Sequence, residues 1–268
     1  MERDIAVLVG AIMIARLDRS GFRKSAVLVT TVEYKDDEGA ALQGWLYVPD
    51  GHVAALPGVL VVPEAPGCGP MPARRARMLA EMGYAAFVMD IYGDGLFVGY
   101  TPEAEALAND MIANPALLLR RVEAGLRTMK TLPSVDANRV AAVGYCLGGM
   151  GVLNLVRSGV KLKAAVAFHG LLAPFVSDTA EPISTPILLC TGTEDPFVPL
   201  ADVVRFCDEM TAARADYRVV MYGGAGHAFT SFEITPGLVP VASGKFGYDE
   251  AADNEAWAQM SRMLDQFV

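Results

Sequence analysis

The sequence has no Cys-x-x-Cys pair and only three histidines, and its four cysteines lie far apart along 268 residues. Structural zinc sites and dithiol redox sites depend on closely spaced ligands or thiols. The sequence therefore indicates neither a zinc site nor a redox motif. We expect no metal and no organic cofactor.

Positive charge is also scarce. The chain has 22 lysines and arginines against 31 acidic residues, which gives a formal net charge of −9. Nucleic-acid binding requires a basic surface that neutralises phosphates, and here the basic residues are spread along the chain. The composition argues against a nucleic-acid partner, and the negative charge mainly favours solubility.

Linkers, repeats and long apolar runs are absent as well. The apolar stretch 5–15 is too short to cross a membrane, the residues before it carry no net positive charge, and no small-x-small cleavage pattern follows it. We expect residues 1–24 to form an apolar arm or helix and residues 25–268 to form a single domain. The sequence predicts no membrane partner and a cytoplasmic location.

The sequence does contain strand and helix patterns in regular alternation. Two β-rich runs, 26–33 and 42–48, flank a polar turn and predict an antiparallel hairpin. From Gly58 onward, short apolar runs alternate with amphipathic segments, which favours a mainly parallel sheet covered by helices on both faces. The apolar runs are 59–62, 85–89, 140–143, 164–168, 187–189 and 219–222, and the expected helices are 74–82, 116–130, 147–159, 201–213 and 250–268.

The most informative motif follows the run 140–143. Gly144-Tyr145-Cys146-Leu147-Gly148 is the Gly-x-nucleophile-x-Gly pattern of a strand that turns sharply into a helix, with cysteine as the central residue. Small residues are required on both sides of such a turn because the backbone packs closely there. At a helix N-terminus the Cys146 thiolate would be favoured. The alternative is that Cys146 is only a small buried apolar residue.

Two later loops supply an acid and a base. Asp195 follows the run 187–189, and His227 follows the run 219–222. The order nucleophile, acid, histidine is that of an α/β-hydrolase triad. The alternatives are a helix cap or turn role for Asp195 and an exposed loop position for His227. In the functional interpretation, Cys146 attacks, His227 moves the proton and Asp195 orients His227, while the backbone N–H groups of Leu147 and Ala65 form the oxyanion hole.

At these residues the chain resembles the dienelactone hydrolase family, the cysteine branch of the α/β-hydrolases. The resemblance covers roughly residues 28–268 and implies an α/β-hydrolase fold and hydrolysis of a carboxylic ester or lactone through a thioacyl-enzyme. It also implies that Glu64 holds the resting thiol and helps to generate the thiolate. A carboxylate at the end of a buried strand is costly unless it is hydrogen-bonded or functional, so a structural role for Glu64 stays open. The matching segments are 57–64, 90–95, 144–149, 192–199 and 227–229.

The chain departs from this family where the substrate would bind. Two arginines clamp the substrate carboxylate in characterised members, and the matching positions here are Asp94 and Ser231. Binding of a small anionic lactone is therefore in doubt. We expect Asp94 and Ser231 to lie in the substrate pocket together with Tyr92, Tyr145 and Phe229.

Other readings of the same sequence stay open. The fold could serve as a catalytically silent ligand-binding or scaffold module, or the triad could cleave thioesters or peptides. The protein is expected to be a monomer or homodimer. The remaining cysteines and histidines are expected to pack, to lie at the surface or to bond nearby loops: Cys68, Cys190, Cys207, His52 and His169. Helical Arg74, Arg75 and Arg77 are expected to be structural or solvated.

Overall fold

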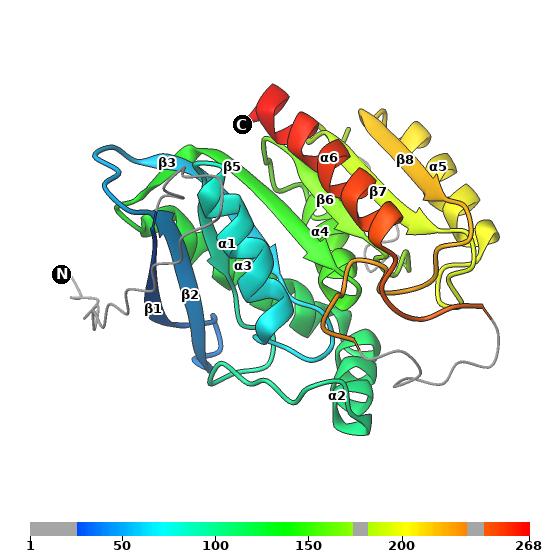
Figure 1. Cartoon of the computed structure of the whole chain (residues 1–268), viewed down its shortest axis with the longest axis horizontal. Coiled ribbons are helices and arrows are strands. Elements are labelled where there is room, and N and C mark those ends of the chain that lie inside the picture. Colours follow the sequence, from blue (N-terminus) through cyan, green and yellow to red (C-terminus); the bar gives the residue numbers. More distant parts are fainter. Residues whose placement is uncertain (1–25, 174–181, 235–243) are drawn as a thin grey trace, which may run out of the picture.

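One eight-stranded sheet forms the centre of the part of the chain that the computed structural model describes, residues 26–173, 182–234 and 244–268. Its strand order is β1-β2-β4-β3-β5-β6-β7-β8, and the strands from β3 onward are parallel (Figure 1). The predicted arm 1–24 lies outside the described residues. The strands are β1 (Val27–Lys35), β2 (Ala41–Pro49), β3 (Leu56–Val62), β4 (Ala85–Val88), β5 (Val135–Tyr145), β6 (Ala165–Phe168), β7 (Ile187–Gly192) and β8 (Tyr217–Tyr222).

The first two strands form the antiparallel hairpin that the sequence predicts. Strand β2 joins the hairpin to the rest of the sheet by pairing antiparallel with β4. Because the other six strands run in one direction, the loops after their carboxyl ends meet at one edge of the sheet. The mainly parallel architecture is therefore confirmed.

Helices cover both faces of the sheet. Helices α1 and α6 pack into one apolar cluster and lie in front of the sheet in Figure 1, while α3, α4 and α5 contribute to a second cluster on the opposite face. The sequence did not predict α2, which buries only Ala104, Ala108 and Met111 and so lacks a strong apolar stripe. The helices are α1 (Pro70–Glu81), α2 (Pro102–Ala113), α3 (Pro115–Thr131), α4 (Leu147–Arg157), α5 (Leu200–Ala212) and α6 (Glu250–Phe267).

A buried ion pair joins the two helices of the first face. Arg75 in α1 bonds Asp253 in α6, and both side chains are almost completely buried. Arg75 also donates a hydrogen bond to the carbonyl oxygen of Thr230 at 2.7 Å, and its guanidinium lies 5.1 Å from the Trp257 ring. The loop that carries His227 is thereby attached to the helical layer.

The turn from β5 into α4 is packed so closely that it requires glycine on both sides of Cys146. A Cβ atom at Gly144 would lie 2.1 Å from the carbonyl oxygen of Gly148, and one at Gly148 would lie 2.2 Å from that of Val62. Both contacts are with backbone, which cannot move aside as a flexible side chain can. The turn therefore holds Cys146 against the end of β3.

Gly148→Ala is expected to lower the free energy of unfolding by about 3 kcal/mol, because the added methyl must displace the β3 backbone. Urea unfolding followed by circular dichroism would measure this change. Gly223→Ala is the matched control, since a Cβ atom there meets nothing within 4 Å. Equal unfolding midpoints for the two variants would contradict this account of the turn.

Candidate active site

The site lies where the carboxyl ends of the parallel strands meet. Cys146 follows β5 directly, at φ 51° and ψ −115°, a conformation that non-glycine residues rarely adopt. Its backbone N–H donates to the carbonyl oxygen of Phe168 at the end of β6. The sharp, strained turn expected from the motif is therefore present, with Cys146 immediately before α4.

His227 is seated by backbone hydrogen bonds on both sides. Its N–H donates to the carbonyl oxygen of Lys245 at 2.8 Å, and its own carbonyl oxygen accepts from Gly247 at 2.9 Å. The imidazole Nε2 lies 3.0 Å from the sulfur of Cys146. Residues 81 positions apart in the sequence are thus within hydrogen-bond distance.

Asp195 lies on the other side of the His227 ring from Cys146 and contacts its second nitrogen. Its Oδ2 lies 2.8 Å from Nδ1 of His227, and its Oδ1 accepts a hydrogen bond from the N–H of Phe197 at 2.8 Å. Both Asp195 and His227 are buried. The carboxylate can therefore fix the orientation of the imidazole and stabilise its protonated form.

The surroundings of His227 raise its pKa. Burial alone would lower this pKa, but the negative charge of Cys146 and the hydrogen bond with Asp195 outweigh burial and raise it to about 10. The imidazole therefore holds its proton at neutral pH and loses it as the pH rises through about 10. A proton on Nε2 lies within hydrogen-bond distance of the Cys146 sulfur.

Cys146→Ser is expected to lower the pKa of His227 by at least one pH unit, because an opposite charge at this distance contributes about 1–3 pH units. Ring ¹⁵N shifts of His227 followed across pH would measure the change, and only three histidines need to be assigned. Cys207→Ser, in α5, is the matched control and should leave the titration unaltered. An unchanged His227 pKa in the Cys146 variant would exclude the thiolate as its cause.

Glu64 is buried beside these residues, but it does not hold the thiol in this structure. Its hydrogen bonds come from the hydroxyls of Tyr100 and Ser231, the latter at 2.8 Å, whereas the Cys146 sulfur contacts His227. Burial raises the pKa of Glu64 above its usual range, although both hydroxyls favour the carboxylate. The arrangement implied by the family resemblance therefore differs from the one observed.

Tyr92 organises the backbone near Cys146. Its hydroxyl donates to the carbonyl oxygen of Ala65 at 2.8 Å and so fixes the loop after β3. The loop after β4 is held in turn by the buried Asp90, which accepts hydrogen bonds from the N–H groups of Tyr92, Gly93 and Gly95. Leu147 begins α4, and the first N–H groups of a helix have no partner within it. The geometry is compatible with oxyanion donors at Leu147 and Ala65.

Two residues expected in the substrate pocket belong to the core. Tyr145 is fully buried and stacks on Phe168 at 5.0 Å between ring centroids, in the cluster covered by α1 and α6. Phe229 is also fully buried in that cluster. Successive residues of a strand point to opposite faces, so the residue before Cys146 points away from it. The expectation for Tyr145 was wrong for this reason, and the expectation for Phe229 was wrong because its ring is enclosed in the same cluster.

The other three expected pocket residues differ in their exposure to solvent. Asp94 is exposed on the loop after β4, Tyr92 is half-buried, and Ser231 is buried against Glu64. Arg74 forms an ion pair with Glu233 at 2.7 Å and so has a structural role, as expected.

Sequence reasoning missed three residues near Glu64 and His227. Tyr100 bonds Glu64, and the rings of Phe197 and Phe246 flank His227 at centroid distances of 4.9 and 5.6 Å. No local motif marked Tyr100 or Phe246. The position of Phe197, two residues after Asp195, was a signal that could have identified it.

The remaining histidines and cysteines have local partners. His169 is buried and bonds the hydroxyl of Thr230 at 2.8 Å, and His52 bonds Pro49 and Ser134 away from the site. Cys190 is buried in β7, and Cys207 lies in α5 and packs against the core. Cys68 bonds the carbonyl oxygen of Met89, and burial raises its pKa well above the ordinary value.

With this geometry in place, the chain can be compared with known proteins. A model of the dienelactone hydrolase family matches residues 42–268. The chain belongs to the dienelactone hydrolase family. It is accordingly a hydrolase of carboxylic esters with the α/β-hydrolase fold.

Individual relatives agree with this family assignment. The solved structure named m3DLH is 30% identical with a TM-score of 0.82, and a dienelactone hydrolase-like promiscuous phosphotriesterase from metagenomic libraries is 31% identical with a TM-score of 0.84. Both matches cover 90% of this chain and 98% of the other. A Synechocystis protein named as a carboxymethylenebutenolidase is 26% identical over 88% of this chain and 96% of its own length.

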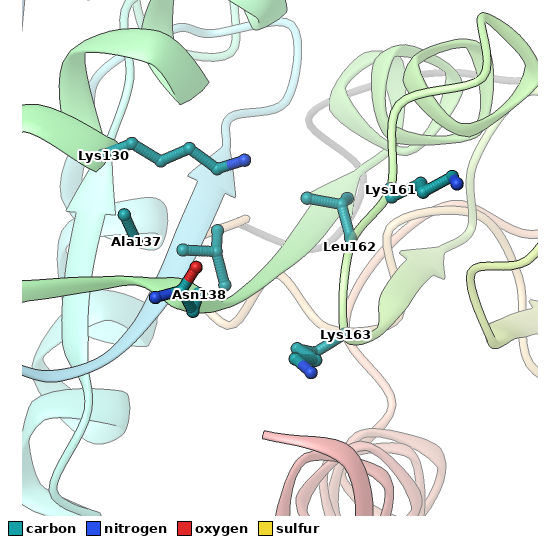
Figure 2. A pocket seen from close by; sticks show the side chains of 7 residues that line it. Lys130, Ala137, Asn138, Lys161, Leu162 and Lys163 are labelled. Carbon is teal, nitrogen blue, oxygen red and sulfur yellow. The ribbon is translucent and has the colours of Figure 1, made fainter.

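A separate hollow lies near the amino ends of the parallel strands β5 and β6. This space of about 300 Å³ is lined by three lysines, Lys130, Lys161 and Lys163 (Figure 2). Asn138 and Val140 also line it. From Val140 to Tyr145, β5 rises by about 16 Å. The hollow is therefore remote from Cys146.

The described ranges contain no group of three or more His, Cys, Asp or Glu side chains arranged to hold a metal ion. No helix within those ranges is long and apolar enough to span a membrane.

Proposed function

We propose that this dienelactone hydrolase family member cleaves its ester or lactone through a Cys146–His227–Asp195 triad and a thioacyl-enzyme. The observation that carries the proposal is the pair of contacts at His227, 3.0 Å to the Cys146 sulfur and 2.8 Å to Asp195. One imidazole thus contacts both a nucleophile and an orienting carboxylate.

In the first half-reaction, the Cys146 thiolate attacks the carbonyl carbon and forms a C–S bond. The carbonyl π electrons move to oxygen, and the N–H groups of Leu147 and Ala65 stabilise that oxyanion. When the intermediate collapses, the C–O bond to the leaving group breaks, and the departing oxygen takes the proton from Nε2 of His227. A thioester at Cys146 remains.

In the second half-reaction, the now neutral His227 takes a proton from water as the water oxygen attacks the thioester. Collapse of this intermediate breaks the C–S bond, releases the carboxylic acid and restores the thiolate–imidazolium pair. Asp195 holds the imidazole throughout. Glu64 is proposed to poise the thiol, which requires its carboxylate to exchange a hydroxyl partner for the sulfur.

The proposal also includes the binding partner of the protein and its cellular compartment. The partner is a small-molecule ester or lactone, and the protein acts in the cytoplasm as a monomer or homodimer. A reducing compartment suits the four free cysteines, which include the proposed nucleophile.

Trapping the acyl-enzyme tests the mechanism. With p-nitrophenyl acetate, we expect a burst of nitrophenol equal to the protein concentration and one acetyl group on the peptide that contains Cys146. Brief acid quenching and peptide mass spectrometry would locate the acetyl group. Turnover with no acyl group on Cys146, under conditions where a burst is seen, would contradict the proposal.

A further inference from the structure

We infer that the substrate of this site is a neutral ester with an apolar acyl or alcohol group, and not an ester that carries a carboxylate. This inference rests on the proposed triad and specifies which substrates reach it. It is drawn from the charges and the exposed side chains of the loops around Cys146.

The loops at the site are strongly acidic. In the described segments that follow the parallel strands, together with 244–249, there is one lysine, Lys245, and no arginine. The same segments contain seven carboxylates: Glu64, Asp90, Asp94, Glu194, Asp195, Glu233 and Asp249. Excess negative charge around a site repels anions and lowers their local concentration.

The cations nearest to these loops already have acidic partners. Lys245 pairs with Glu194 at 3.2 Å. Arg74 in α1 donates to both carboxylate oxygens of Glu233, at 2.7 and 3.1 Å, and to the carbonyl oxygen of Thr230. Arg75 is buried with Asp253. A substrate carboxylate would have to break one of these pairs to be neutralised.

The polar groups closest to the triad are occupied in the same way. Ser231 is fully buried and donates its hydroxyl to Glu64, so it offers no donor to a substrate anion while that bond persists. Glu64 also lies close to the catalytic atoms. An anionic substrate would therefore face carboxylates here instead of a guanidinium clamp.

The basic hollow of Figure 2 cannot compensate for this arrangement. Its three lysines lie at the amino ends of β5 and β6. That edge is about 16 Å from Cys146 along β5, whereas the carboxylates lie on the loops of the site itself, and the interaction between charges weakens with distance.

Apolar side chains gather on the same acidic loops. The three most exposed phenylalanines of the described ranges lie there: Phe97 at 45%, Phe197 at 48% and Phe232 at 66%. Phe197 contacts the His227 ring, and Phe232 packs against the partly exposed Tyr248 at 5.5 Å between centroids. Exposed aromatic groups beside a reactive centre are suited to bind an apolar substituent.

A matched pair of esters tests this inference. p-Nitrophenyl hexanoate and p-nitrophenyl hydrogen adipate have the same leaving group and equally long acyl chains, but only the second carries a carboxylate. After correction for spontaneous hydrolysis, we expect kcat/KM to be at least about tenfold higher for the hexanoate at low salt. The ratio of the two kcat/KM values should fall as sodium chloride is added, because salt screens the repulsion between the adipate carboxylate and the acidic loops.

A variant locates the apolar contact. Phe232→Ser is expected to lower kcat/KM for the hexanoate about fivefold through KM, while p-nitrophenyl acetate, which lacks the chain, is affected less. Val53→Ser is the matched control, since Val53 is fully exposed between β2 and β3.

The outcomes separate this inference from the mechanism. If the adipate ester is hydrolysed as fast as the hexanoate and Cys146→Ala abolishes both reactions, the substrate class is wrong and the triad stands. If Cys146→Ala leaves hydrolysis of both esters intact, the mechanism itself fails. Equal effects of Phe232→Ser and Val53→Ser on kcat/KM would show that Phe232 does not contact the substrate.

Discussion

Replacing Cys146 with alanine is expected to lower kcat/KM for a p-nitrophenyl ester by a factor of about 10³ or more, because the methyl group cannot form the thioester. The remaining activity would come from oxyanion stabilisation and substrate binding, which persist when a nucleophile is removed. Steady-state release of nitrophenol would measure the loss. The amount of folded protein in each sample would be determined from its unfolding transition. The variant should fold, since Cys146 is only partly buried and alanine is the smaller residue.

Cys207→Ala is the matched control for this experiment. The same side chain is removed there, but Cys207 lies in α5 and packs against the core away from His227. Its kcat/KM should stay within about twofold of the parent value. Cys146→Ser adds a second comparison, because a hydroxyl keeps the shape of the thiol but is far less ionised at neutral pH. A Cys146→Ala protein as active as Cys207→Ala would remove Cys146 from the reaction.

The fold could be predicted from the sequence because its local patterns and its architecture agree. Short apolar runs marked each buried parallel strand, and a proline or a glycine marked many helix ends. Helix α2 escaped prediction for a physical reason. Its apolar residues are not confined to one face, and only Ala104, Ala108 and Met111 are buried, so its sequence shows no clear 3.6-residue period.

The contacts among the three residues of the proposed triad were also predictable, because parallel strands bring their carboxyl ends together. Cys146, Asp195 and His227 each follow a strand, so their meeting depends on topology and not on fine details of packing. Tyr145 shows where this reasoning fails. Proximity to Cys146 in the sequence suggested a pocket residue, but the alternation of side chains along β5 directs it into the opposite face.

The partners of Glu64 could not be predicted. Tyr100 lies 36 residues later, in the irregular segment between β4 and α2, where no periodic signal fixes the direction of a side chain. Ser231 approaches Glu64 because Arg75 and the β-bridge between His227 and Phe246 constrain the loop after β8. Both contacts depend on long-range packing of loops, which local sequence patterns do not encode.

Replacing His227 with glutamine is expected to reduce kcat/KM by a factor of about 10³, because glutamine cannot donate a proton to the leaving group or accept one from water. The loss should appear in kcat, with KM little changed, since His227 acts on protons and not on substrate binding. The side chain is similar in length and can keep a hydrogen bond to Asp195, which limits the effect on stability. His52→Gln is the matched control, because His52 bonds Pro49 and Ser134 at a distance from the site.

Combining the two substitutions tests whether Cys146 and His227 act as one unit. If the thiolate depends on the imidazolium, Cys146→Ala/His227→Gln should be no less active than Cys146→Ala alone, because once the nucleophile is absent the base has nothing to activate. Independent contributions would instead multiply, and the double variant would lose about 10⁶-fold. Full kinetics for the four proteins of this cycle would separate the two cases. A multiplicative loss would show that His227 acts through a partner other than Cys146, in conflict with the 3.0 Å contact between them.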